Sequence, residues 1–154
     1  MTEITRMIWL GDSSDAEHAD LRAAGIGAIL NVAHDLQGRR GWHDGIEYAQ
    51  CGLVDGPGNT MASYHAAILK LAALVTGGRK TLCHCHEGKS QSVAVVVCVL
   101  HLLEGRRGWD HWRKVVVEKV AASGREIPDD KPHPEHRAAF NRLNWRLLAS
   151  VMEG

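Results

Sequence analysis

Short apolar stretches alternate along this chain with longer segments whose apolar residues recur every three or four positions. The short stretches predict β-strands over residues 4–10, 26–32, 46–53 and 79–82. The longer segments predict helices over residues 13–24, 60–76, 92–103, 110–123 and 134–151. Strands that alternate with helices favour an α/β fold, with a central, mostly parallel sheet flanked by helices.

Several boundaries and faces of these helices can be predicted from residue types. Ser13 or Ser14 suits the cap of the first helix, and Asp110 suits the cap of the fourth. The segment 92–103 is apolar nearly all round, which predicts a buried helix. Pro134 suits the first turn of the last helix. Its inner face is predicted to carry Phe140, Leu143, Leu147 and Val151.

Length and composition narrow the class of protein. A chain of 154 residues predicts one domain, 1–154. Eighteen basic residues balance eighteen acidic ones, so net charge supports binding to neither nucleic acid nor membranes. No apolar run reaches the length of about 20 residues that a membrane span needs, and Met7 to Leu10 is too short for the core of a secretory signal. We therefore expect a reducing, cytoplasmic location, where cysteines stay free.

The stretch from Leu82 to Ser92, LCHCHEGKSQS, joins a predicted strand to the buried helix. A tight loop with a glycine that leads into a helix forms an anion site, because the first N–H groups of the helix lack partners and the helix dipole adds positive charge. Cys85 begins this loop, where the thiolate is favoured. The pattern predicts a cysteine nucleophile in a loop that also holds a phosphate group, although a buried core cysteine would fit position 85 too.

The stretch also resembles a known signature. In the Cys-dependent protein tyrosine phosphatases the loop reads His-Cys-x-x-Gly-x-x-Arg-Ser/Thr, and here it reads HCHEGKSQS over residues 84–92. The opening segment IWLGDSSDAEHADLRAAGIGAILNVA and the later segment KPHPEHRAAFNRL resemble the small, atypical type of the dual-specificity branch. The resemblance covers nearly the whole chain. It implies a phosphatase that needs no metal and no cofactor, and whose substrate is a phosphorylated protein or another phosphomonoester.

The resemblance assigns a role to each loop residue. Cys85 would attack phosphorus, His84 would support the loop, and the hydroxyl of Ser92 would stabilise the departing thiolate unless Ser92 is a plain helix cap. The phosphate would be held by backbone N–H groups of His86, Glu87, Gly88, Lys89, Ser90 and Gln91. Asp55, in the Gly/Pro loop after the strand 46–53, would be the general acid, the alternative being a turn aspartate.

Gln91 stands where the family has arginine. Arginine grips two phosphate oxygens through charged, parallel hydrogen bonds, and a glutamine amide is neutral. Three interpretations are open: a weak phosphatase, a phosphate-binding module without turnover, or a substitution introduced into an active enzyme to trap substrate.

The same residues also suggest other chemistries. The spacing of Cys83 and Cys85 does not match a zinc site. Cys51 is a candidate redox partner for Cys85. The phosphoester could belong to an RNA end, a lipid or a sugar instead of a protein. Rhodanese-like sulfur transfer also uses a cysteine in an anion loop, but the Asp55 loop favours a phosphatase.

Overall fold

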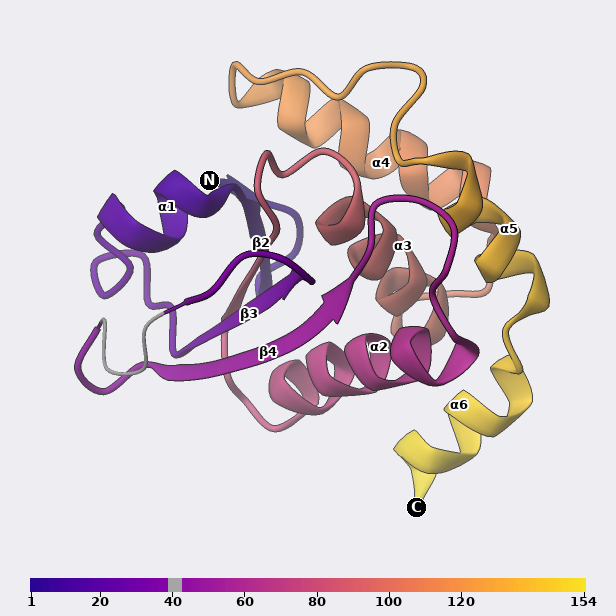
Figure 1. Ribbon diagram of the computed structural model, residues 1–154. Coiled ribbons are helices and arrows are strands. Elements are labelled where there is room, and N and C mark those ends of the chain that lie inside the picture. The colour runs from indigo at the N-terminus through magenta and orange to yellow at the C-terminus, as the bar shows by residue number, and fades with distance from the viewer. Residues whose placement is uncertain (39–42) are drawn as a thin grey trace.

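A computed structural model describes residues 1–38 and 43–154 of the chain (Figure 1). The connection between the predicted strands 26–32 and 46–53 therefore includes four residues, 39–42, that lie outside the described residues. The described part forms a five-stranded sheet of order β1-β2-β5-β3-β4. The strands are β1 (Thr2–Glu3), β2 (Ile8–Gly11), β3 (Ala28–Ala33), β4 (Glu47–Leu53) and β5 (Thr81–His84). Only β1 runs antiparallel to its neighbour, which confirms the mostly parallel sheet.

Helices cover both faces of this sheet. They are α1 (Ser13–His18), α2 (Met61–Thr76), α3 (Gln91–Leu103), α4 (Trp109–Ala122), α5 (Pro134–Arg142) and α6 (Trp145–Glu153). The large core lies between the sheet and the helices from α2 to α6, whereas α1 belongs to a smaller cluster on the other face. Helices α2 and α3 lie side by side under the sheet (Figure 1). No helix of the described residues is both long and apolar enough to cross a membrane.

The central strand and the helix that follows it are the most buried elements. All four residues of β5 are buried between β2 and β3. Every residue of α3 from Gln91 to His101 is buried too, as the apolar sequence predicted. The loop between β5 and α3 is therefore held at both of its ends by the core.

The first strand and the first helix are shorter than predicted. Residues 4–10 include a turn, because the Thr5 hydroxyl accepts hydrogen bonds from the N–H groups of Met7 at 3.2 Å and Ile8 at 3.0 Å. The cap of α1 is Asp12, not Ser13 or Ser14. Asp12 and Asp15 each accept a hydrogen bond from the other's backbone N–H, which forms a capping box. Helix α1 ends at His18, well before Ala24.

The later helices also differ from the prediction. Gly108, with φ of 92°, precedes α4, so Asp110 lies in the first turn and is not the cap. The predicted last helix is two helices, because Leu143 is extended and the Asn144 side chain caps a new helix by accepting from the Leu147 N–H at 3.0 Å. The break changes which side chains face inward: Leu148 is 1% exposed, whereas Leu147 and Val151 are 47% and 51% exposed.

Neighbouring leucines of α6 test this correction. We expect Leu148→Ala to lower the free energy of unfolding by about 2–5 kcal/mol, because it leaves a cavity in the core. The matched change Leu147→Ala should stay within about 0.5 kcal/mol, because its side chain is largely in water. Chemical denaturation of both variants measures the difference. Equal losses would mean that the predicted single helix describes this segment better.

Candidate active site

The loop from Cys85 to Ser90 turns sharply at the carboxyl edge of the sheet, between β5 and α3. Gly88 has a φ of +71°, and a Cβ added there would lie 2.7 Å from the backbone oxygen of Gly11. On the neighbouring side of the loop, the His86 carbonyl accepts hydrogen bonds from the Ser13 N–H at 3.1 Å and the Ser13 hydroxyl at 3.3 Å. The end of β2 and the start of α1 thus fix the path of the loop.

Cys85 and Ser92 are in contact where the loop enters α3. The Cys85 Sγ lies 3.1 Å from the Ser92 Oγ, and both residues are buried. Ser92 is in the first turn of α3, whereas Ser90 occupies the cap position, so the interpretation of Ser92 as a plain helix cap is wrong. The Ser92 hydroxyl can instead donate to a sulfur that carries negative charge.

His84 supports the loop from below. Its Nδ1 lies 3.1 Å from the Cys85 carbonyl oxygen. Burial lowers the pKa of His84, which keeps the ring neutral, so Nδ1 carries the proton and donates to that carbonyl. This contact fixes the backbone at the residue before the loop turns.

A cavity of about 500 Å³ opens above Cys85. It brings together most of the residues that the sequence singled out, and its lining includes Asp55, Cys85, His86, Glu87, Lys89, Ser90 and Gln91. Three other predicted residues lie outside the lining and support the loop: His84, Gly88 and Ser92. His34, Asp35, Val54 and Lys131 complete the wall.

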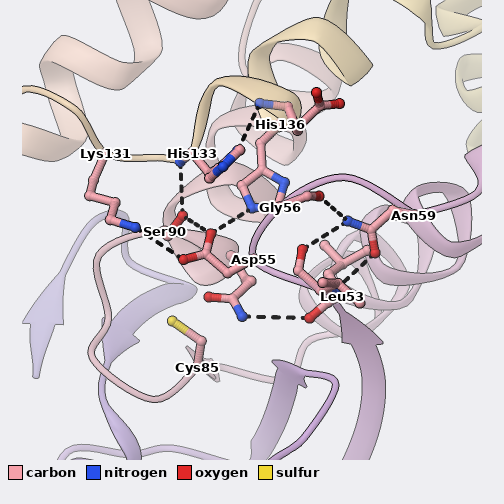
Figure 2. Close-up of polar contacts among 12 residues, drawn as sticks. Leu53, Asp55, Gly56, Asn59, Cys85, Ser90, Lys131, His133 and His136 are labelled. Carbon is pink, nitrogen blue, oxygen red and sulfur yellow. Dashed lines mark hydrogen bonds and ion pairs between the residues drawn. The ribbon is translucent and has the colours of Figure 1, made fainter.

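Asp55 reaches this cavity from the loop after β4 and is held by three side chains (Figure 2). Its Oδ1 accepts from the Ser90 hydroxyl at 2.5 Å and lies 3.2 Å from His136 Nε2. Its Oδ2 lies 3.1 Å from Lys131 Nζ. Partial burial raises the pKa of Asp55, but the Ser90 hydrogen bond and Lys131 lower it by more, so the net shift is downward. The resting carboxylate is therefore ionised.

His136 links Asp55 to the core of the protein. The ring is buried, and its Nδ1 lies 2.6 Å from the Tyr64 hydroxyl. Burial raises the pKa of Tyr64 to about 12, so the phenol keeps its proton and donates it to Nδ1. The other ring nitrogen then carries the hydrogen that Asp55 accepts. Sequence analysis missed both His136 and Lys131, although they lie in the segment KPHPEH that carried part of the family resemblance.

Comparison with solved structures identifies the fold. No protein-family model and no curated sequence matches the chain. Human DUSP28 is 16% identical with a TM-score of 0.76, covering 99% of this chain and 98% of that one. A mouse putative dual specificity phosphatase complexed with zinc tungstate is 20% identical with a TM-score of 0.78, covering 98% and 90%. A human tyrosine phosphatase-like serine/threonine/tyrosine-interacting protein is 19% identical with a TM-score of 0.74, covering 92% and 93%. The chain has the dual-specificity phosphatase fold.

Within this dual-specificity phosphatase fold, Gln91 lines the cavity, and its side-chain amide also contacts the end of β4. Gln91 is 6% exposed, and its Nε2 donates to the Leu53 carbonyl at 3.5 Å. Its amide therefore ties the start of α3 to the end of β4. Because this amide is neutral, it cannot give phosphate oxygens the paired, charged hydrogen bonds that an arginine gives.

The other thiols lie apart from this arrangement. All four cysteines are free. Burial raises the pKa of Cys51, Cys83 and Cys98, so these three thiols stay protonated at neutral pH. Among the described residues, no group of three or more His, Cys, Asp or Glu side chains is arranged to hold a metal ion.

Two glycines with similar backbone angles test how the loop is fixed. Gly88→Ala should lower stability by more than about 2 kcal/mol, because positive φ and a clash with backbone act together. Gly78, with φ of +87°, has open space where a Cβ would stand, so Gly78→Ala should cost only about 1 kcal/mol. Thermal unfolding of both variants compares the two costs. If Gly88→Ala were as stable as Gly78→Ala, the contact with Gly11 would not constrain the loop.

Proposed function

We propose that this chain is a phosphatase that hydrolyses phosphate monoesters through a cysteinyl-phosphate intermediate. The contact that carries the proposal is the one between Cys85 Sγ and Ser92 Oγ, at the base of a cavity that Asp55 also lines. Nucleophile, stabilising hydroxyl and carboxyl group come from three different segments, yet they meet where the unpaired N–H groups of α3 point. The dual-specificity phosphatase fold agrees with this assignment.

In the first step the Cys85 thiolate attacks phosphorus, an S–P bond forms, and the bond to the leaving oxygen breaks. That oxygen takes a proton from Asp55, which acts as general acid. Backbone N–H groups from His86 to Gln91 hold the phosphate oxygens, and the helix dipole of α3 stabilises their charge.

In the second step the Asp55 carboxylate accepts a proton from water, the water oxygen attacks phosphorus, and the S–P bond breaks. The Ser92 hydroxyl donates a hydrogen bond to the departing thiolate. Inorganic phosphate leaves, and Asp55 and Cys85 return to their starting states. The mechanism uses no metal and no cofactor.

A non-catalytic phosphate-binding module is the second candidate, and Gln91 is its evidence. Position 91 holds glutamine, so the signature loop lacks the guanidinium that neutralises charge in the transition state. The Gln91 amide donates to the Leu53 carbonyl. By analogy with arginine fingers, such a loss can cost about 10³–10⁵ in rate. Binding without turnover would follow if no other cation compensates.

The proposed chemistry requires a phosphate monoester as the substrate. We propose a phosphorylated protein carrying phosphotyrosine, phosphoserine or phosphothreonine as the first candidate, and an RNA end, a lipid or a sugar phosphate as alternatives. We further propose that the protein works in the reducing cytoplasm, because all four of its thiols are free and the nucleophile must stay reduced.

Replacing single thiols tests the assignment of the nucleophile. Cys85→Ser should lower kcat/KM on an aryl phosphate by about 10⁴-fold or more, because the serine hydroxyl is a far weaker nucleophile than a thiolate. Cys51→Ser is the matched control, since Cys51 lies on β4 outside the cavity lining, and it should keep full activity.

Equal activity of wild type and Cys85→Ser would exclude the mechanism. A wild-type protein that binds phosphate but gives neither turnover nor a burst of product would favour the binding module.

The lowered pKa of Asp55 predicts how the rate depends on pH. A general acid must be protonated, and a carboxyl group with a lowered pKa is protonated only in acidic solution. For an alkyl phosphate, whose leaving group needs a proton, kcat/KM should therefore fall as the pH rises through the acidic range. Asp55→Asn should lower the rate at acidic pH by about 10²–10⁴-fold and remove this decline. A wild-type profile that Asp55→Asn leaves unchanged in shape would assign the acid role elsewhere.

A further inference from the structure

The loop that would hold the phosphate lacks the arginine of the family signature. A phosphate monoester brings nearly two negative charges, and the cavity already contains the carboxylates of Asp35, Asp55 and Glu87. Gln91 is neutral and faces Leu53. Backbone N–H groups and the helix dipole supply only partial charges. A full cation from another segment would balance the ligand.

Lys131 is such a cation, and it comes from the loop between α4 and α5. Its amine is 3.1 Å from Asp55 Oδ2, and its side chain is 30% exposed. Figure 2 shows the Lys131 amine on one side of the Asp55 carboxylate and the Cys85 sulfur on another, and all three residues line the same cavity. A short movement of a flexible lysine side chain would bring the amine from Asp55 to a phosphate group on Cys85.

The backbone that carries Lys131 is firmly held. The Lys131 carbonyl accepts two hydrogen bonds from Arg113, at 3.0 Å from Nε and 2.7 Å from Nη2. Arg113 also donates to the Pro128 carbonyl at 3.2 Å. Two residues later, the His133 N–H donates to the Ser90 hydroxyl at 2.9 Å, which joins this segment to the phosphate loop itself. The lysine is thus presented to the cavity by an anchored loop.

Lys89, the other amine of the cavity, fits the role less well. It also lines a second cavity, together with Asp12, Arg125 and Glu126. Lys89 therefore lies between two cavities. Lys131, in contrast, already binds the carboxylate of Asp55, which lies beside the proposed reacting atoms.

We propose that Lys131 binds the phosphate dianion and so takes the place of the arginine that the signature loop lacks. The inference rests on the proposed function, and it assigns the cation of that same site.

The movement of Lys131 from Asp55 to the phosphate would also protonate Asp55, the proposed general acid. When Lys131 moves to the phosphate, Asp55 loses a cation and gains a negative neighbour, so its carboxylate takes up one proton from solvent. The groups that face Asp55 are Lys131 from the loop, His136 from α5 and the Ser90 hydroxyl, with Cys85 below. His136 is neutral, since burial lowers its pKa, so Lys131 is the only one of the described contacts of Asp55 that can withdraw a full positive charge. Phosphate binding should therefore be coupled to proton uptake.

Calorimetric titration with tungstate, a phosphate-like oxyanion, measures both effects on the wild type and on Lys131→Met. The variant should fold, because the contacts that anchor the loop use the backbone of Lys131 and its side chain binds only Asp55 among the described residues. We expect Kd to rise at least about tenfold, as for loss of one charged hydrogen bond. Proton uptake, read from buffers of different ionisation enthalpy, should fall below that of the wild type, because Asp55 in the variant no longer loses a cation when the oxyanion binds.

Three further variants test whether the positive charge at this place is what binds the oxyanion. Lys131→Arg keeps a cation and should bind within about threefold of wild type. Lys114→Met removes an exposed amine of α4 that does not line the cavity, and should leave both Kd and proton uptake unchanged. Adding Gln91→Arg to Lys131→Met should restore binding, because the loop then regains its own cation.

The outcomes distinguish this inference from the proposed function. If the wild type binds tungstate and turns over substrate while Lys131→Met binds within about twofold of it, the assignment of Lys131 is wrong and the phosphatase proposal stands. If the wild type neither binds oxyanions nor turns over any phosphate ester, both proposals are wrong. Weaker binding with unchanged proton uptake would also contradict the exchange, since a merely structural role predicts that result.

Discussion

The close approach of Gly88 to the Gly11 carbonyl is the constraint on which the rest of the site depends. The positive φ of Gly88 lets the chain turn between β5 and α3, whose first N–H groups have no partner within the helix. Because β5 and α3 are both buried, the turn cannot relax by moving either end. Cys85 and Ser92 meet at 3.1 Å as a consequence of this path. The geometry of the proposed nucleophile is thus a property of the core as much as of the loop.

Asp55 shows how a distant segment completes what the loop begins. The loop before α5 and the start of α5 provide Lys131 and His136, and the same segment donates the His133 N–H to Ser90. These contacts keep the resting carboxylate ionised, which suits a base in the second step and opposes an acid in the first. The proposed exchange of Lys131 between Asp55 and phosphate would resolve this conflict, because the proton would arrive together with the substrate.

The sequence predicted those parts of the site that are local in the chain. Strand, glycine loop and apolar helix follow one another within residues 79–103, so Cys85 and its loop could be located from pattern alone. Lys131 and His136 could not be, because they contact Asp55 across 76 and 81 positions and carry no periodic signal. The break at Asn144 was missed for another reason: the apolar spacing of Leu143, Leu147 and Val151 continues through it, and only the tertiary fold shows that Leu148 is buried instead.

In the proposed mechanism, the phosphoryl group of the substrate becomes bonded to the sulfur of Cys85. The most direct measurement is rapid acid quenching of a reaction with an aryl phosphate, followed by mass spectrometry of the peptide that contains Cys85. The cysteinyl-phosphate mechanism predicts an added phosphoryl group on Cys85 that appears within the first turnover, accumulates when Ser92 is replaced by alanine, and is absent from Cys85→Ser. Turnover in which no phosphorylated Cys85 forms in either the wild type or Ser92→Ala would contradict it.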